Sequence, residues 1–296
     1  MKWIIQNEHD GMMIRDYLRI VHGFSRRILI MVKEAGGIKV NDIPQTVRYY
    51  LKKGDLLQIT FPKESIGLHM KAEEMDISIV YEDEAVLVVD KPAGIATIPS
   101  LNHPTGTVAN GILGYYVKHN IPYTVHVVTR LDRDTSGLLL IAKNRYSHSL
   151  MAKSQKEGKV KRRYKAIVEG SMERMTGTIN APIDRKENSI IERTVRETGK
   201  RAVTHFQVEK WLTSHTYVNI QLETGRTHQI RVHFSYLNHP LAGDDLYGGT
   251  KRDINRQALH CSMLSFEHPF TKKVIDLDSP LPDDMAGFIE NFNQMN

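Results

Sequence analysis

Residues 129–142, Thr-Arg-Leu-Asp-Arg-Asp-Thr-Ser-Gly-Leu-Leu-Leu-Ile-Ala, join a charged loop to an apolar run. Two carboxylates, Asp132 and Asp134, alternate there with the guanidinium groups of Arg130 and Arg133. The apolar run is typical of a strand buried on both faces, which would fix the loop at the edge of a core. Charged groups held at such an edge often perform acid–base or nucleophilic chemistry. The same composition is also common in turns whose ion pairs are solvated, so the segment alone leaves both interpretations open.

A second charged segment, residues 222–233, reads Leu-Glu-Thr-Gly-Arg-Thr-His-Gln-Ile-Arg-Val-His. We expect a strand to end at Gly225 and a helix to begin at Thr227, and a helix N-terminus is a natural anion site. The side chains gathered there are Arg226, His228, Arg231 and His233. The two histidines are five residues apart, so they do not share a helical face as zinc-binding pairs do. The spacing therefore predicts hydrogen-bonding histidines and no metal site.

The composition is that of a globular protein with a polyanionic partner. The 296 residues are 41% hydrophobic and 25% charged, with a formal net charge of +6. Cys261 is the only cysteine, which excludes an intramolecular disulfide and fits a reducing compartment. No apolar run approaches the roughly 20 residues of a membrane span, and the N-terminal sequence becomes acidic too early for a signal peptide. We expect a cytoplasmic monomer that does not interact with a membrane.

Positive charge is concentrated in two places. Residues 1–65 carry eleven Lys or Arg against seven Asp or Glu. Residues 153–165 carry seven Lys or Arg against Glu157 alone, and they include Tyr164. Either cluster can be a solvated surface, but basic residues interleaved with an aromatic side chain favour binding to RNA phosphates.

The first 65 residues are organised as a small module. Apolar spacing predicts helices over residues 12–19 and 25–35, and short strands at 38–40 and 54–59. This order resembles the small RNA-binding module named after a ribosomal small-subunit protein. The matching residues are Gly11, Arg15, Leu18, Ser25, Arg26, Gly37-Ile38-Lys39-Val40-Asn41 and Lys53-Gly54-Asp55. The resemblance implies phosphate contacts, which position RNA without reading its sequence, from Arg15, Arg26, Arg27 and Lys39.

Residues 66–76 have the composition of a linker, and residues 77–296 form a larger part with many strands and few helices. Strands are predicted at 77–90, 165–168, 204–208, 218–222 and 274–277, and helices at 107–117, 147–155 and 228–237. Because strands and helices do not alternate regularly, the pattern predicts an α+β fold on a largely antiparallel mixed sheet.

The motifs of this larger part, in their order, resemble those of the RluA-type pseudouridine synthases. They are Arg130-Leu131-Asp132 with Thr135-Ser136-Gly137, Arg163-Tyr164-Lys165-Ala166, residues 225–233, Leu241-Ala242-Gly243-Asp244 with Tyr247-Gly248, and Gln257-Ala258-Leu259-His260. The resemblance implies the pseudouridine synthase fold. It also implies an isomerase that detaches the base of an RNA uridine and rejoins it to the sugar through carbon 5, without a cofactor or a metal ion.

The resemblance further implies roles for individual side chains. Asp132 is the expected catalytic aspartate, acting as a nucleophile on the sugar or the base, or as a base toward the sugar. Arg231 is its expected partner, because a guanidinium can pair bidentately with a carboxylate and keep it ionised when it is partly buried. Tyr164 is expected to stack on the target uracil, and its hydroxyl could help to move the carbon-5 proton.

Other side chains are expected to bind the substrate. Leu131 and Ile230 would supply apolar walls for the detached base, and Arg130 would fill the space that the flipped uridine leaves. Arg226 belongs to the expected anion site. The family usually has His before Arg-Leu-Asp, where this chain has Thr129; since a hydroxyl can still donate a hydrogen bond, we expect an active enzyme.

We therefore predict an RNA pseudouridine synthase that modifies large-subunit rRNA by base flipping, with tRNA as the alternative substrate. A non-catalytic RNA-binding factor of ribosome assembly would use the same folds and leave Asp132 dispensable. A glycoside hydrolase would use Asp132 and Asp134 as acid and nucleophile, although basic surfaces favour a polyanion over a neutral sugar. For Arg130, the structural alternative is a salt bridge to Asp134.

Overall fold

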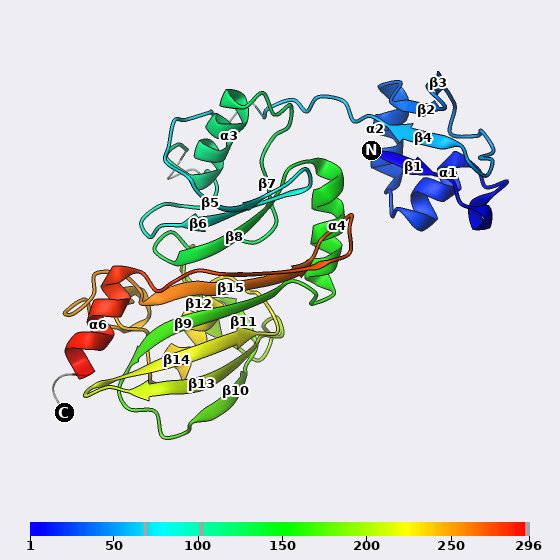
Figure 1. The fold of residues 1–296 in the computed structure, drawn as a ribbon. Coiled ribbons are helices and arrows are strands. Elements are labelled where there is room, and N and C mark those ends of the chain that lie inside the picture. The colour runs from blue at the N-terminus through cyan, green and yellow to red at the C-terminus, as the bar shows by residue number, and fades with distance from the viewer. Residues whose placement is uncertain (68–69, 101–103, 294–296) are drawn as a thin grey trace.

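The computed structural model describes residues 1–67, 70–100 and 104–293 (Figure 1). Residues 68–69 of the predicted linker lie outside this described part. In the remainder, regular elements stop at residue 59 and resume at residue 78. This break supports our proposed division into a module of residues 1–65, a linker of residues 66–76 and a catalytic part of residues 77–296.

The N-terminal module contains a four-stranded antiparallel sheet in the order β1-β4-β2-β3. Its strands are β1 (Lys2–Ile4), β2 (Ile38–Val40), β3 (Ile43–Pro44) and β4 (Leu56–Ile59), and its helices are η1 (Asn7–His9), α1 (Ile14–Asp16), η2 (Tyr17–Val21) and α2 (Arg26–Glu34). The Ser25 hydroxyl caps α2 by accepting a hydrogen bond from the Ile28 amide at 3.3 Å, which satisfies one of the free N–H groups of its first turn. Ile28, Leu29 and Val32 then form the buried stripe of this helix.

The catalytic part is organised around a ten-stranded sheet in the order β10-β13-β14-β9-β15-β8-β6-β5, with β16 beside β15 and β7 beside β8. The strands are β5 (Ser78–Glu82), β6 (Val86–Lys91), β7 (His126–Val127), β8 (Ser136–Ala142), β9 (Lys161–Glu169), β10 (Thr176–Asn180), β13 (Val203–Trp211), β14 (His215–Leu222), β15 (Leu259–Glu267) and β16 (Val274–Asp278). A separate hairpin pairs β11 (Ile183–Arg185) with β12 (Arg193–Val195). The α+β fold on a largely antiparallel mixed sheet is confirmed.

One strand joins the two halves of this sheet. Strand β15 pairs antiparallel with β9 on one side and parallel with β8 on the other, and β15·β8 is the one parallel pair of the sheet in the described residues. Figure 1 shows β15, in orange, running between β8 and β9. The parallel contact is short, because it joins only Ser136 to His260 and Gly137 to Cys261.

Helices of the catalytic part are α3 (Val108–Lys118), α4 (Arg145–Lys156), α5 (Gln229–Tyr236), η3 (Asp245–Tyr247) and α6 (Asp283–Asn293). Thr107 and Asn144 cap α3 and α4 with side-chain oxygens, as N-cap residues commonly do. The pattern of the sequence predicted α3, α4 and α5, but not α6. None of the helices in the described ranges is long and apolar enough to cross a membrane.

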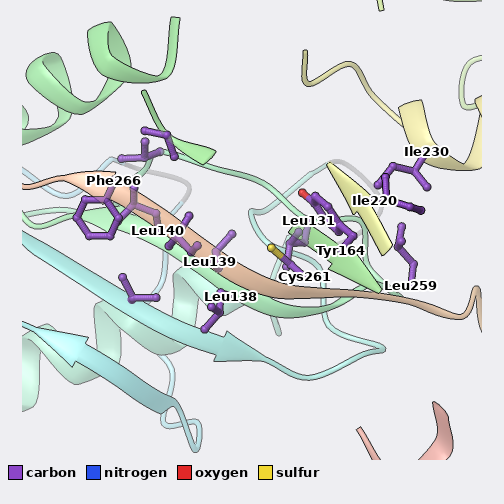
Figure 2. Close-up of a cluster of buried hydrophobic side chains, with 14 of the residues drawn as sticks. Leu131, Leu138, Leu139, Leu140, Tyr164, Ile220, Ile230, Leu259, Cys261 and Phe266 are labelled. Atoms are coloured by element: carbon purple, nitrogen blue, oxygen red, sulfur yellow. The ribbon is translucent and has the colours of Figure 1, made fainter. Parts of the chain in front are cut away.

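The core of the catalytic part leads directly to its charged loop. All residues of β8 are buried, as the apolar run predicted. Figure 2 shows the side chains of Leu138–Leu140 continuing into a second group that surrounds Tyr164. The charged loop before β8 is therefore anchored on a closely packed strand.

The module is docked on the catalytic part through Tyr146 of α4. The Tyr146 hydroxyl donates to the His22 carbonyl at 2.5 Å, and its ring centroid lies 4.3 Å from that of Phe24. Tyr146 is 2% exposed and belongs to the hydrophobic core of the module.

Candidate active site

A cavity of about 480 Å³ lies where the 129–135 loop, β9 and the N-terminal end of α5 meet. Seven residues singled out from the sequence line it together: Arg130, Leu131, Asp132, Tyr164, Arg226, Ile230 and Arg231. They come from three distant segments of the chain, so the fold brings together what the separate motifs predicted.

Two buried side chains hold the 129–135 loop in place. The Lys91 ammonium, with the residue 1% exposed, donates to three backbone carbonyls at 2.8 Å each, including that of Arg133. The Thr97 hydroxyl donates to the Leu131 carbonyl at 2.7 Å. Asp132 lies between these two anchored carbonyls, so its backbone is fixed on both sides.

Arg231 connects two carboxylates at the cavity. Its Nη1 donates to Oδ2 of Asp132 at 3.2 Å, while its Nε and Nη2 donate to both oxygens of Asp244 at 2.7 Å. The bidentate pair is thus made with Asp244 rather than with Asp132, because Asp244 occupies the fork of the guanidinium. Burial opposes the charge, but the hydrogen bonds and charges of Asp244 and Asp132 raise the pKa of Arg231 above its ordinary value.

Asp132 remains accessible while Asp244 does not. The Asp132 side chain is 28% exposed, against 1% for that of Asp244. Asp244 therefore holds the guanidinium, and Arg231 in turn presents one N–H group to a carboxylate that can still meet a substrate. The motif Leu241-Ala242-Gly243-Asp244 marked this aspartate in the sequence, but no local pattern indicated its partner.

His228 also lies beside Asp132, which the spacing of the histidines did not predict. His228 has a φ of 57°, and its Nε2 is 3.8 Å from Oδ2 of Asp132. Its Nδ1 is 2.8 Å from the hydroxyl of Tyr247, whose ring centroid is 4.9 Å from Cζ of Arg231. Burial lowers the pKa of His228, although the charge of Asp132 opposes this. His233, in contrast, makes two hydrogen bonds inside the core.

Tyr164 forms the floor of the cavity from strand β9. The residue is 4% exposed, and burial raises the pKa of its phenol, which therefore stays protonated at neutral pH. Figure 2 shows its ring next to Leu131, with Ile230 on the far side of the cluster. Leu131 and Ile230 are 6% and 4% exposed, so both line the cavity as apolar surfaces. This position fits the predicted walls of a base-binding pocket.

The sequence of the chain is also similar to those of known proteins. A family model described as RNA pseudouridylate synthase matches residues 85–236. The chain belongs to this family. An uncharacterized RNA pseudouridine synthase of Bacillus subtilis (strain 168), YjbO, is 52% identical over 92% of this chain and 96% of its own length. Ribosomal large subunit pseudouridine synthase D of Neisseria meningitidis is 36% identical over 90% of this chain and 75% of its own length.

The fold agrees with this assignment. A solved structure of human RNA Pseudouridylate Synthase Domain Containing 1 is 26% identical, with a TM-score of 0.58, over 73% of this chain and 86% of that chain. The chain is an RNA pseudouridine synthase, an isomerase that acts on uridines in RNA.

Thr129 has a structural role in this pseudouridine synthase. The residue is 1% exposed, and its hydroxyl accepts a hydrogen bond from the Leu140 amide at 3.0 Å. Its backbone N–H donates to the Leu140 carbonyl at 3.2 Å. Thr129 thus ties the start of the loop to the middle of β8, accepting with its hydroxyl where we expected it to donate.

Asp134 takes no part in the cavity of the synthase. Its carboxylate pairs with Arg133, with Nε at 3.1 Å from Oδ1, and it lines a different surface hollow. The expected alternative salt bridge from Arg130 to Asp134 is therefore absent from the described residues, and Arg130 is exposed at the cavity. The glycoside hydrolase hypothesis is wrong, because it requires both carboxylates to face one substrate.

The four cations predicted in the module do not line this cavity. All four are exposed, and they are Arg15, Arg26, Arg27 and Lys39. Arg15 is paired with Asp16, with Nε at 3.1 Å from Oδ1, which reduces its value as a phosphate ligand. Arg26, Arg27 and Lys39 form no ion pair within the described part of the chain and stay our candidates for RNA contacts.

Proposed function

We propose that this enzyme modifies uridines of large-subunit ribosomal RNA and that Asp132 is its catalytic aspartate. The observation that carries the proposal is the accessible Asp132 carboxylate, held by Arg231 and facing a cavity with an aromatic floor. Arg231 donates a hydrogen bond to this carboxylate, and a carboxylate can act as a nucleophile or as a base.

The reaction needs a site that retains a detached base. The bond between the uracil N1 and the sugar C1′ breaks, the base turns, and its C5 bonds to C1′ while the C5 proton leaves and N1 gains one. Leu131, Ile230 and Tyr164 enclose the base with apolar surface during this rotation. The target uridine reaches them by leaving its stack, which costs a few kcal/mol.

The substrate is proposed from two separate features. Several relatives with 36–40% identity are ribosomal large subunit pseudouridine synthases D, among them the proteins of Neisseria meningitidis and Pseudomonas aeruginosa. The module presents Arg26, Arg27 and Lys39 to solvent, and cations of this kind contact phosphates without reading sequence. Together these features favour a large structured RNA.

Mapping pseudouridines in total RNA tests the proposal. RNA from cells with the gene and cells without it is treated with carbodiimide and mapped by primer extension. We expect one or more large-subunit rRNA signals to disappear with the gene, and to return with the wild-type protein. A loss of signals from tRNA alone would contradict the rRNA assignment.

The same assay tests Asp132. We expect Asp132→Asn to restore none of the signals while still binding RNA, because the amide can act neither as a nucleophile nor as a base. Asp134→Asn is the matched control two residues away and should restore them fully. Normal modification by Asp132→Asn would refute the catalytic role.

A further inference from the structure

Arg162 lines the cavity. The sequence places it in the basic cluster at residues 153–165, but the proposed mechanism gives it no role. Side chains alternate between the two faces of a strand, so Arg162 and Tyr164 of β9 share the face that meets the cavity. Arg163 and Lys165 line a different hollow of the sheet. Of the basic cluster at residues 153–165, Arg162 is the one cation among the cavity-lining residues.

The charge of Arg162 has no counter-ion in the described residues. No Asp or Glu oxygen there lies within 4.0 Å of its guanidinium. Its Nη1 donates to the Tyr164 hydroxyl at 3.4 Å, while its Nε is buried and has no hydrogen-bond partner. Arg231, in the same cavity, is paired with two carboxylates. A partly buried guanidinium without a partner costs free energy. The position beside Arg162 in the cavity is therefore suited to an anion.

The surroundings of Arg162 are shaped for its guanidinium. A Cβ atom at Gly225 would lie 2.6 Å from Nη2 of Arg162, so the absence of a side chain at Gly225 leaves room for this group. Gly225 precedes Arg226 and α5, and both Gly225 and Arg226 line the cavity. The guanidinium of Arg162 thus lies beside the loop that also carries the exposed cation Arg226.

We propose that Arg162 binds the phosphate group adjoining the target uridine. This inference rests on the proposed function. Uracil is neutral and cannot compensate the charge of Arg162, whereas the RNA backbone carries one negative charge per nucleotide. A planar guanidinium binds phosphate through parallel N–H groups. When the base enters the cavity beside Tyr164, its own backbone phosphate is the anion that reaches Arg162.

Replacing a phosphate by a neutral group tests this contact. The substrate is a short RNA that carries the uridine mapped above, with a methylphosphonate at the linkage on either its 5′ or its 3′ side. Single-turnover rates at subsaturating enzyme are measured for the wild type and for Arg162→Ala. At one of the two linkages we expect the wild type to lose about 10- to 100-fold in rate, which is typical of a lost charge-assisted hydrogen bond.

The variants give the decisive comparison. On the native RNA, the rate of Arg162→Ala should fall by a similar factor. Replacing the phosphate by a methylphosphonate should not lower the rate of this variant further. Arg174→Ala removes the same charge from an exposed position that does not line the cavity, and it should keep the wild-type rate and the wild-type sensitivity. Arg162→Gln repeats the comparison if thermal unfolding shows that Arg162→Ala is not folded.

Two results would overturn the inference. A wild type that is active but insensitive to both methylphosphonates has no such phosphate contact. Equal methylphosphonate losses in the wild type and in Arg162→Ala would show that Arg162 acts on Tyr164 or on the base instead. Failure of the proposed function is distinguishable, because the wild type would then form no pseudouridine in the native RNA.

Discussion

At the scale of single residues, Lys91 holds the backbone next to Asp132, the proposed catalytic aspartate. Its three carbonyl acceptors match the three N–H groups of an ammonium. Burial lowers the pKa of Lys91 from 10.5 to about 7, although the charges of Asp134 and Asp132 oppose this. The clamp on the 129–135 loop is therefore sensitive to pH.

Lys91→Met should reveal this titration as a change in stability. The variant leaves the three carbonyls that accept from the buried Lys91 ammonium without this donor, so we expect it to lose about 3 kcal/mol in free energy of unfolding. Between about pH 7 and the pKa of Lys91 in the unfolded chain, Lys91 is protonated in the unfolded wild type but has released its proton in the folded wild type. The wild type should therefore gain stability over the variant as the pH rises, by at most about 1.4 kcal/mol per pH unit.

Urea unfolding of both proteins between about pH 6 and pH 9 measures this difference. Below about pH 7, both states of the wild type are protonated, and the difference should be constant. A difference that stays constant up to pH 9 would show that Lys91 keeps its proton in the folded protein.

The sequence predicts well which residues lie at the site where one motif alone identifies the residue. Asp132, Tyr164 and Arg231 were singled out from their motifs, and the fold brings them to one cavity. The sequence did not predict the positions of Asp244, His228 and Arg162 at the cavity, because their partners lie on segments far away in the chain. Local spacing contains no information on which charge meets which after folding.

At the scale of elements, Gly137 sets how closely β8 and β15 approach. Its φ is 110°, and a Cβ atom there would lie 2.3 Å from the carbonyl oxygen of Cys261. Both the backbone conformation and the close contact require glycine. Because Gly137 is the second residue of β8, which directly follows the 129–135 loop, a shift here would also move Asp132.

We expect Gly137→Ala to lose about 3 kcal/mol or more in stability, together with most of the activity. Gly158→Ala is the control, because Gly158 also has a positive φ, of 73°, but no atom lies within 4 Å of its Cβ position. The control should lose only about 1 kcal/mol and stay active. Thermal unfolding and a pseudouridine assay measure both effects. Equal losses in the two variants would mean that φ alone matters.

Most elements of the catalytic part follow from local patterns, but their arrangement does not. The apolar run of β8 and the helical stretch at 107–117 are visible in the sequence. The parallel pairing of β8 with β15 is not, since an apolar strand pairs equally well with many others. The acidic start of α6, at Asp283 and Asp284, suits a helix N-terminus. Its apolar residues Met285, Phe288, Ile289 and Phe292 have helical spacing, so α6 was predictable from the sequence and was missed.

At the scale of the whole molecule, the proposed RNA contacts of the module are separate from the proposed site of the chemistry. Its exposed cations Arg26, Arg27 and Lys39 lie outside the cavity. We expect the triple alanine variant to bind RNA with a salt dependence whose slope, log K against log salt concentration, is weaker by about 2, since each phosphate contact adds about 0.7 for a single strand. Filter binding over a range of salt concentrations measures the slope.

A control variant removes the same charge elsewhere. Three exposed lysines outside the module serve this purpose, and they are Lys71, Lys118 and Lys200. Their alanine variant should keep the wild-type slope. If both triple variants change the slope equally, binding depends on net charge and not on the module.

The position of β15 in the chain also sets the stage of synthesis at which we expect the active site to form. One half of the sheet carries the loop with Asp132, and the other half carries Tyr164 and precedes Arg231, while β15 provides the backbone hydrogen bonds between the halves. Ser136 and His260, neighbours across this seam, are 124 residues apart in the chain. Contacts of such long separation form slowly, and a chain emerging from the ribosome folds from its N-terminus. We therefore expect a nascent chain that ends before residue 259 to hold Asp132 and Arg231 in two parts of the sheet that β15 does not yet join, and to acquire activity only after β15 has been synthesised.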